Sequence, residues 1–425
     1  VEMERTDPSV LIPLQSNTEK IRNFCIIAHV DHGKTTLSDS LVSSNGIISS
    51  KLAGKLRFLD STEEEQKRGI TMHSSAISLH FKMNRQVEQS GDAVSSSTTS
   101  DQVEEDFLIN LVDCPGHIDF SSDVSTATRL CDGALIVVDV LEGICTQTHA
   151  VLYKALRERL RPCLVLNKID RLALEMQLST VEAFHHLRRL IENVNALAFT
   201  LLNSELLLQI DEDERQRDHL SDEEPMLSLW TFSPDKGNVV FTAAFDCWGF
   251  GVNKFVSLWS TKLGVSKSIL KKYIFDDYAF NPTTKKLFKC NPTDHPNVKP
   301  MFASMILDPI WQMYDVCVTQ QNPEKAAKMA SRGLGIDLPP REVNKREPRL
   351  TLQSILRRWL PLADTILRMV VRCMPSPAAA QRDRSRLHTL LPMVLSPDIN
   401  RNDSTFQTVL QCQDCITSCA TSNKN

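Results

Sequence analysis

The stretch IIAHVDHGKTTL, residues 26–37, joins an apolar run to a segment with helical spacing. Its Gly-Lys-Thr triplet is typical of a phosphate-binding loop, in which backbone N–H groups and a helix N-terminus face the phosphates. Gly33 would let the backbone approach them, Lys34 would contact the β- and γ-phosphates, and the Thr35 hydroxyl would bind Mg²⁺. Ala28 stands where this motif has its first glycine, and alanine fits that turn if its φ stays negative.

Three further motifs follow in order, each at the end of an apolar run that we expect to be a strand. They are DCPG (113–116), NKID (167–170) and FTAA (241–244). A Gly-Lys-[Ser/Thr] triplet alone arises by chance with a probability of about 0.2 in such a chain. Asp113 could hold the magnesium shell, and the Gly116 N–H could bond the γ-phosphate. The ordered set therefore favours a nucleotide site over an accident.

The NKID motif indicates which base the site would bind. The Asp170 carboxylate can accept two hydrogen bonds, from N1–H and the 2-amino group of guanine. Adenine offers neither donor there, and each lost charged hydrogen bond costs about 1.5–3 kcal/mol. A backbone N–H near Ala243 and Ala244 could meet the guanine oxygen. The sequence therefore predicts GTP and GDP as ligands, together with Mg²⁺.

Apolar runs alternate with helical segments through the first two hundred residues, which predicts an α/β fold. Val, Ile and Leu dominate these runs without polar alternation, as in a mostly parallel, doubly wound sheet covered on both faces. Residues 74–81 alternate in polarity and should form a strand near the edge. Helical segments dominate after about residue 265, and Pro361 should kink or divide one of them.

Composition shifts suggest a division of the chain. We expect an N-terminal extension (1–20), a GTP-binding domain (21–265), a helical insert or extension of that domain (266–377), and an irregular or disordered tail (378–425). The serine- and acid-rich stretches near 84–105 and 203–237 are expected to be mobile insertions. No β-barrel pattern is recognisable before the chain stops.

Composition limits the class of protein. The chain has 425 residues and a formal net charge of −4, so whole-chain charge does not point to a nucleic-acid binder. No apolar run approaches the roughly 20 residues that span a bilayer. The first ten residues do not form a secretory signal, and twelve cysteines without framework spacing suit a reducing compartment. A cytoplasmic protein that makes no membrane contact is expected.

The motifs AHVDHGKTTL, RGITM, DCPGHIDF and NKIDR resemble those of translational GTPases of the elongation factor 2 branch. Within that branch, residues 43–81 are most similar to the elongation factor-like GTPase 1 group, and the resemblance extends to about Gln381. It implies that Thr71 binds Mg²⁺ and senses the γ-phosphate, while His117 orients the attacking water. It also places further residues at the nucleotide, namely Asp31, His32, Thr36, Asn167 and Lys168.

The resemblance implies a GTP-hydrolysing switch that acts on the large ribosomal subunit in late 60S maturation. Such a factor promotes release of the anti-association factor, initiation factor 6, with a partner of the Shwachman–Bodian–Diamond type. It would contact ribosomal RNA, act as a monomer, and show low intrinsic GTPase activity that 60S subunits stimulate. Two alternatives stay open: an elongation factor 2-type translocase, and a truncated nucleotide-binding fragment without ribosome-coupled activity.

Two positions depart from the family pattern. Ala243-Ala244 replaces the usual Ser-Ala, and Cys247 stands where a glycine is usual. The first change removes a hydroxyl but keeps the backbone N–H. We therefore expect GTP affinity to be weakened or unchanged, with specificity retained.

Overall fold

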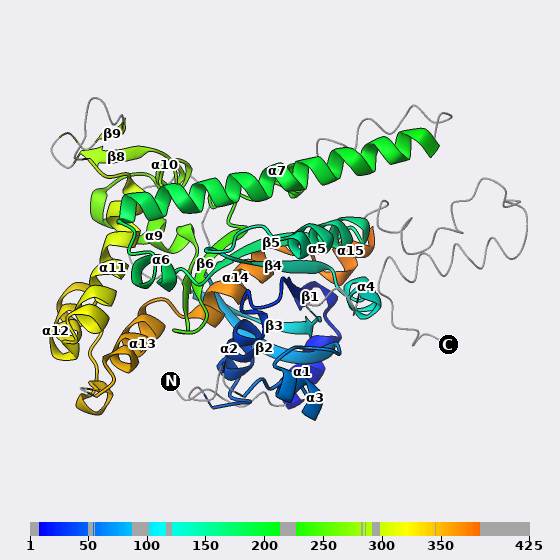
Figure 1. The fold of residues 1–425 in the computed structure, drawn as a ribbon, viewed down its shortest axis with the longest axis horizontal. Helices are drawn as coiled ribbons and strands as arrows, with labels where there is room; N and C mark the ends of the chain where they lie inside the picture. Colours follow the sequence, from blue (N-terminus) through cyan, green and yellow to red (C-terminus); the bar gives the residue numbers. More distant parts are fainter. Residues whose placement is uncertain are drawn as a thin grey trace, which may run out of the picture.

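The computed structural model describes residues 8–49, 54, 56–86, 102–115, 121–212, 227–281, 284, 286–290, 298–344 and 346–382. These residues build a seven-stranded sheet in the order β2-β3-β1-β4-β5-β6-β7 (Figure 1). The strands are β1 (Ile21–Ala28), β2 (Ser75–Gln86), β3 (Gln102–Asp113), β4 (Gly133–Asp139), β5 (Arg161–Asn167), β6 (Val239–Ala243) and β7 (Trp248–Phe250).

The sheet is parallel except at its two edges. Strands β3, β1, β4, β5 and β6 pair in parallel, whereas β2 and β7 run antiparallel to their neighbours. The prediction of a mostly parallel sheet is therefore confirmed, and residues 75–81 of the predicted stretch 74–81 belong to the edge strand β2. Because the polar face of an edge strand can reach solvent, β2 keeps the alternation that the central strands lack.

Both faces of the sheet are buried, which explains the continuous apolar runs. Successive residues of β1 face opposite cores: Cys25 and Ile27 join one cluster, and Phe24 and Ile26 join the other. Helices α2 (Lys34–Ser44) and α14 (Leu362–Cys373) cover one face. Helices α5 (Thr146–Arg157), α7 (Thr180–Glu212) and α9 (Val252–Leu263) contribute to the core on the other (Figure 1). The doubly wound arrangement is thus confirmed.

Pro361 divides the long helical segment near the C-terminal end of the described chain, as expected. Helix α13 (Pro348–Trp359) ends before it, and Pro361 is the N-cap of α14. The dividing turn is tied to the sheet, because the Gly249 N–H donates to the Leu360 carbonyl at 3.0 Å. This contact fixes the C-terminal end of α13 beside strand β7.

The segment between α9 and α14 is mainly helical and also contains a small antiparallel sheet that the sequence did not predict. That sheet pairs β8 (Tyr278–Asn281) with β9 (Lys286–Lys289). The other helices are α1 (Pro8–Gln15), α3 (Glu63–Arg68), α4 (Ser121–Arg129), α6 (Asp170–Leu174), α10 (Lys267–Tyr273), α11 (Asp308–Tyr314), α12 (Pro323–Met329) and α15 (Pro377–Arg382). Single π-helical turns at Ala303–Leu307, Asp315–Thr319 and Ala330–Leu334 join several of them.

The expected mobile insertions are only partly described. Helix α7 continues to Glu212, so the first residues of the stretch 203–237 are helical, and Trp230 and Phe232 are buried in the core. Strands β2 and β3 extend to Gln86 and Gln102, which pair with each other. Residues 87–101 and 213–226 lie outside the described residues, as does the predicted tail from 383 onward. Within the described ranges, none of the helices has the length and apolar character needed to cross a bilayer.

Candidate functional site

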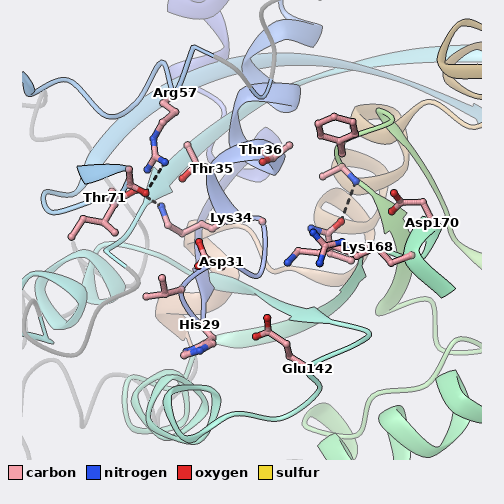
Figure 2. Close-up of a pocket in the computed structure, with 18 of the residues that line it drawn as sticks. His29, Asp31, Lys34, Thr35, Thr36, Arg57, Thr71, Glu142, Lys168 and Asp170 are labelled. Atoms are coloured by element: carbon pink, nitrogen blue, oxygen red, sulfur yellow. Dashed lines mark hydrogen bonds between the residues drawn. The ribbon is translucent and has the colours of Figure 1, made fainter. Parts of the chain in front are cut away.

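A polar pocket of about 640 Å³ opens at the edge of the sheet where the parallel strands end (Figure 2). The carboxyl ends of parallel strands meet at one edge, and ligands of α/β sheets bind there. The motifs after β1, β3, β5 and β6 are therefore brought together although more than two hundred residues separate the first from the last. Their residues around the pocket include Asp31, Gly33, Lys34, Thr35, Thr36, Thr71, Asn167, Lys168, Asp170 and Ala244.

The phosphate loop has the backbone that its sequence requires. Gly33 is the N-cap of α2 with φ 92°, in the left-handed region that favours glycine. A Cβ atom at this position would lie 2.3 Å from Nδ2 of Asn167. Asp31 also has a positive φ, of 63°, which aspartate tolerates. Ala28 is the last residue of β1 and keeps a negative φ, so the absence of the motif's first glycine costs nothing here.

Asn167 joins three loops at the floor of the pocket. Its Nδ2 donates to the His32 carbonyl at 2.9 Å, and its Oδ1 accepts from the Ala244 N–H and the Thr242 hydroxyl, each at 3.1 Å. The Ala244 N–H, proposed above for the guanine oxygen, is therefore already bonded to a side chain. Asn167 therefore holds together the loops that surround this pocket.

Three of the predicted site residues meet at the opposite end of the pocket. Lys34 Nζ donates to the Thr71 hydroxyl at 3.0 Å (Figure 2). It also donates to Asp113 Oδ2 at 2.8 Å. The exposed fractions of Lys34, Thr71 and Asp113 are 7%, 4% and 0%. Burial raises the pKa of Asp113, while the Lys34 ammonium favours its ionised form. A positive charge and two oxygen ligands are thus concentrated where the β- and γ-phosphates are expected.

The same group of residues fits Mg²⁺. Oδ1 of Asp113 is buried and has no hydrogen-bond partner among the residues that the structure describes. Thr71 presents a hydroxyl beside it, and Thr35 lines the pocket from the first turn of α2. Carboxylate and hydroxyl oxygens are hard ligands of the kind that Mg²⁺ prefers. These three residues would hold the ion together with the phosphates.

A buried network that the motif search missed holds the segment carrying Thr71. The Thr71 hydroxyl donates to Asp60 Oδ1 at 2.7 Å, and Arg57 Nε lies 2.5 Å from Asp60 Oδ2. Asp39, on α2, accepts backbone N–H groups from Arg57 and Phe58. This network connects the phosphate-loop helix directly to the predicted switch segment.

Glu65 fixes the same segment from the other side. It forms a capping box with Thr62 and accepts the N–H groups of Met72 and His73, each at 2.9 Å. Burial opposes ionisation of Glu65, but hydrogen bonds from the His73, Thr62 and Met72 backbones outweigh it and lower its pKa to about 2. The T-x-x-E pattern at 62–65 was a sequence signal for this cap.

At the end of the pocket that the sequence predicts to bind guanine, Asp170 is the first residue of α6 and is 6% exposed. Burial and the neighbouring Asp246 raise the pKa of Asp170 to about 6. Lys168 has φ 66°, and its Nζ lies 2.6 Å from Oδ2 of the buried Asp139. Two pocket residues here, Phe245 and Arg349, were not singled out from the sequence.

Three residues of the predicted site are described by the structure but do not line the pocket, namely His32, Asp113 and Ala243, and all three are buried. The His32 ring is buried, with Nδ1 3.3 Å from both the Val137 carbonyl and the Asp139 N–H. Its Nδ1 therefore contacts the end of β4, while its Nε2 lies 3.3 Å from Glu142 Oε2. Gly116 and His117 lie outside the described residues, so their roles stay predictions.

The fold and these residues define a P-loop GTPase with a helical extension. The chain belongs to the family described as the elongation factor Tu GTP binding domain, which matches residues 19–376. This membership confirms the resemblance to translational GTPases and the expectation of a GTPase.

Several relatives are similar along most of the chain. Ribosome assembly protein 1 of Schizosaccharomyces pombe is 46% identical over 379 residues, covering 89% of this chain and 36% of that protein. Elongation factor-like GTPase 1 of Homo sapiens is 44% identical over 388 residues, covering 88% of this chain and 33% of that protein. Ribosome assembly protein 1 of Saccharomyces cerevisiae is 42% identical, with 92% and 34% covered. The chain therefore spans about a third of the length of these curated relatives.

Proposed function

We propose that the chain binds and hydrolyses GTP as a switch on the large ribosomal subunit. The observation that carries this proposal is a single pocket with the phosphate-loop Lys34 at one end and Asp170 at the other. The ribosomal part is supported by the names of the relatives, ribosome assembly protein 1 and elongation factor-like GTPase 1. On the resemblance of residues 43–81, the switch acts in the cytoplasm in late 60S maturation.

The more specific task is release of initiation factor 6 from the 60S subunit, with a partner of the Shwachman–Bodian–Diamond type. In this proposal ribosomal RNA is the contact that turns hydrolysis on. The only support for these partners is the resemblance in sequence. They are the part of the proposal that ribosome-binding experiments must test.

Each residue has a distinct task in nucleotide binding. Lys34 supplies a compact positive charge to the β- and γ-phosphates, and the N-terminus of α2 supplies backbone N–H groups. Mg²⁺, when held by Thr35, Thr71 and Asp113, would neutralise charge that develops on the phosphates. Asp170 accepts the two guanine donors. The hydroxyl of Thr71 is held by Asp60, so a γ-phosphate that recruits it must compete with this hydrogen bond.

Hydrolysis requires a positioned water more than a strong base. On the resemblance, His117 orients that water and becomes productive only on the ribosome. We therefore expect slow turnover by the protein alone and a marked acceleration by 60S subunits. A single-turnover GTPase assay with and without purified 60S subunits measures this directly.

The matched variant is His117→Ala. It should bind GTP within about threefold of the parent, since it leaves the described pocket residues unchanged, yet lose about 100-fold or more of the stimulated rate. Acceleration only by 80S ribosomes would favour a translocase. Fast turnover without ribosomes, or no acceleration by either particle, would contradict the proposed switch.

A further inference from the structure

Arg349, on the first turn of α13, binds the residue that is expected to recognise guanine. Its Nη2 donates to Asp170 Oδ2 at 3.0 Å. The same guanidinium forms two bonds to Asp246, from Nε to Oδ1 at 2.8 Å and from Nη2 to Oδ2 at 2.9 Å. Arg349 therefore bridges two carboxylates, and its planar fork suits this geometry in a way that lysine does not.

Asp246 is the fixed anchor of this bridge. It is fully buried, and it also accepts from the Tyr314 hydroxyl at 2.6 Å and from Gln353 Nε2 at 3.0 Å. Tyr314 in turn accepts from Trp248 Nε1 at 2.8 Å. Residues of β7, α11 and α13 thus hold Asp246, and Asp246 holds Arg349 in one position beside the pocket.

The bridge also reaches the wall of the pocket. The Arg349 guanidinium lies 4.8 Å from the centre of the Phe245 ring, in a cation–π contact. Phe245 lines the pocket although 61% of it is exposed. The cation–π contact therefore restricts the orientation of the Phe245 ring at the edge of the pocket.

We propose that Arg349 is a positioning residue for guanine recognition, which couples the placement of helix α13 to nucleotide affinity. Asp170 must accept two N–H bonds from guanine, and each carboxylate oxygen has two acceptor positions. Oδ2 can therefore accept from Arg349 and from the base together. The inference rests on the proposed function, because it assumes that Asp170 is the base-recognition residue.

The positive charge of Arg349 should affect how guanine binding by Asp170 depends on pH. The groups that act on Asp170 are Asp246, which opposes its ionisation, and Arg349 and Arg171, which favour it; the buried Tyr314 hydroxyl lies near both carboxylates. Only the ionised form of Asp170 accepts both guanine donors. Since its pKa is raised to about 6, guanine affinity should fall as the pH drops through that value. Removing the Arg349 charge should raise the pKa further and move this loss to higher pH.

The experiment compares Arg349→Met with the parent by titration with GDP and Mg²⁺ from pH 5.5 to 8.5. The ratio of the two dissociation constants cancels the titration of GDP itself. If the substitution raises the pKa of Asp170 by about one unit from about 6, the ratio of variant to parent dissociation constants should be near 1 at pH 8.5. It should grow as the pH falls, to about 2 at pH 7 and about 8 at pH 5.5. Arg349→Lys should restore much of the affinity lost at low pH, because it keeps the positive charge beside Asp170.

Arg346→Met is the control, since Arg346 is an exposed arginine three residues earlier; it should leave GDP affinity unchanged at every pH. Thermal unfolding establishes that each variant is folded at the titration temperature. A ratio near one throughout, or one that does not vary with pH, overturns the inference and leaves guanine binding intact. Failure of the parent to bind GDP would instead refute the proposed function.

Discussion

Replacing Asp170 with asparagine should convert the pocket from guanine to xanthine nucleotides. The amide would place an NH₂ group against a guanine donor and would keep one acceptor for the other. Each lost charged hydrogen bond costs about 1.5–3 kcal/mol, and an unpaired donor adds to this, so GDP affinity should fall by about 100-fold or more. Asp170 is nearly buried, so little water is available to compensate.

Xanthine carries a carbonyl where guanine carries the 2-amino group, so Asp170→Asn offers it a matched donor and acceptor. The variant should therefore bind XDP better than GDP, the reverse of the parent. Titration of the parent and of Asp170→Asn with GDP and with xanthosine diphosphate (XDP) measures this reversal of preference. Glu175→Gln is the control, because Glu175 also lines the pocket but lies outside the predicted base contact. An Asp170→Asn protein that still prefers GDP would show that Asp170 does not read the base.

Replacing Lys34 with methionine should nearly abolish nucleotide binding. The change removes charge-assisted bonds to the phosphates, each worth about 1.5–3 kcal/mol. It also leaves the buried Asp113 carboxylate without its ion-pair partner, facing an anionic ligand. The two effects together predict an affinity loss of about 1,000-fold, measured by titration with GDP and Mg²⁺.

The same substitution should destabilise the fold, because breaking a buried ion pair costs about 3–5 kcal/mol. The double variant Lys34→Met with Asp113→Asn separates the two effects. It should regain much of the lost unfolding free energy while nucleotide affinity stays low. Denaturant unfolding and GDP titration on the same samples test this. Recovery of GDP binding in the double variant would mean that Lys34 matters only as a partner for Asp113.

Local sequence patterns predicted the sheet and the residues at its carboxyl edge. Parallel strands that are covered on both faces need continuous apolar runs, which made the strands recognisable. Because the carboxyl ends of such strands meet at one edge of the sheet, the order of the motifs along the chain was enough to place Lys34, Asp113 and Asp170 near one another. The alanine at position 28 was also predicted to fit the phosphate loop, because the loop requires only that its φ stay negative there.

Other features depend on contacts that leave no local pattern. Arg349 lies 179 residues from Asp170 in the chain, and no spacing rule connects them. Asp60 belongs to none of the sequence motifs, yet it is buried against Thr71. Residues 203–212 were predicted to begin a mobile insertion, yet they form the last part of α7, since glutamate, leucine and glutamine are good helix formers.

One departure from the family pattern has a structural consequence. Cys247, where a glycine is usual, has φ 57°, in the left-handed region. A non-glycine residue pays about 1–2 kcal/mol for that conformation. This strained residue lies in the turn between β6 and β7, next to Asp246, which anchors Arg349.

This pocket should select guanine nucleotides over adenine nucleotides. Isothermal titration of the chain with GDP, GTP and ATP, each with Mg²⁺, tests it most directly. Binding of GDP and GTP, with ATP at least about 100-fold weaker, is the predicted result, because adenine lacks both donors that Asp170 accepts. Comparable affinity for ATP, or no binding of either guanine nucleotide, would contradict it.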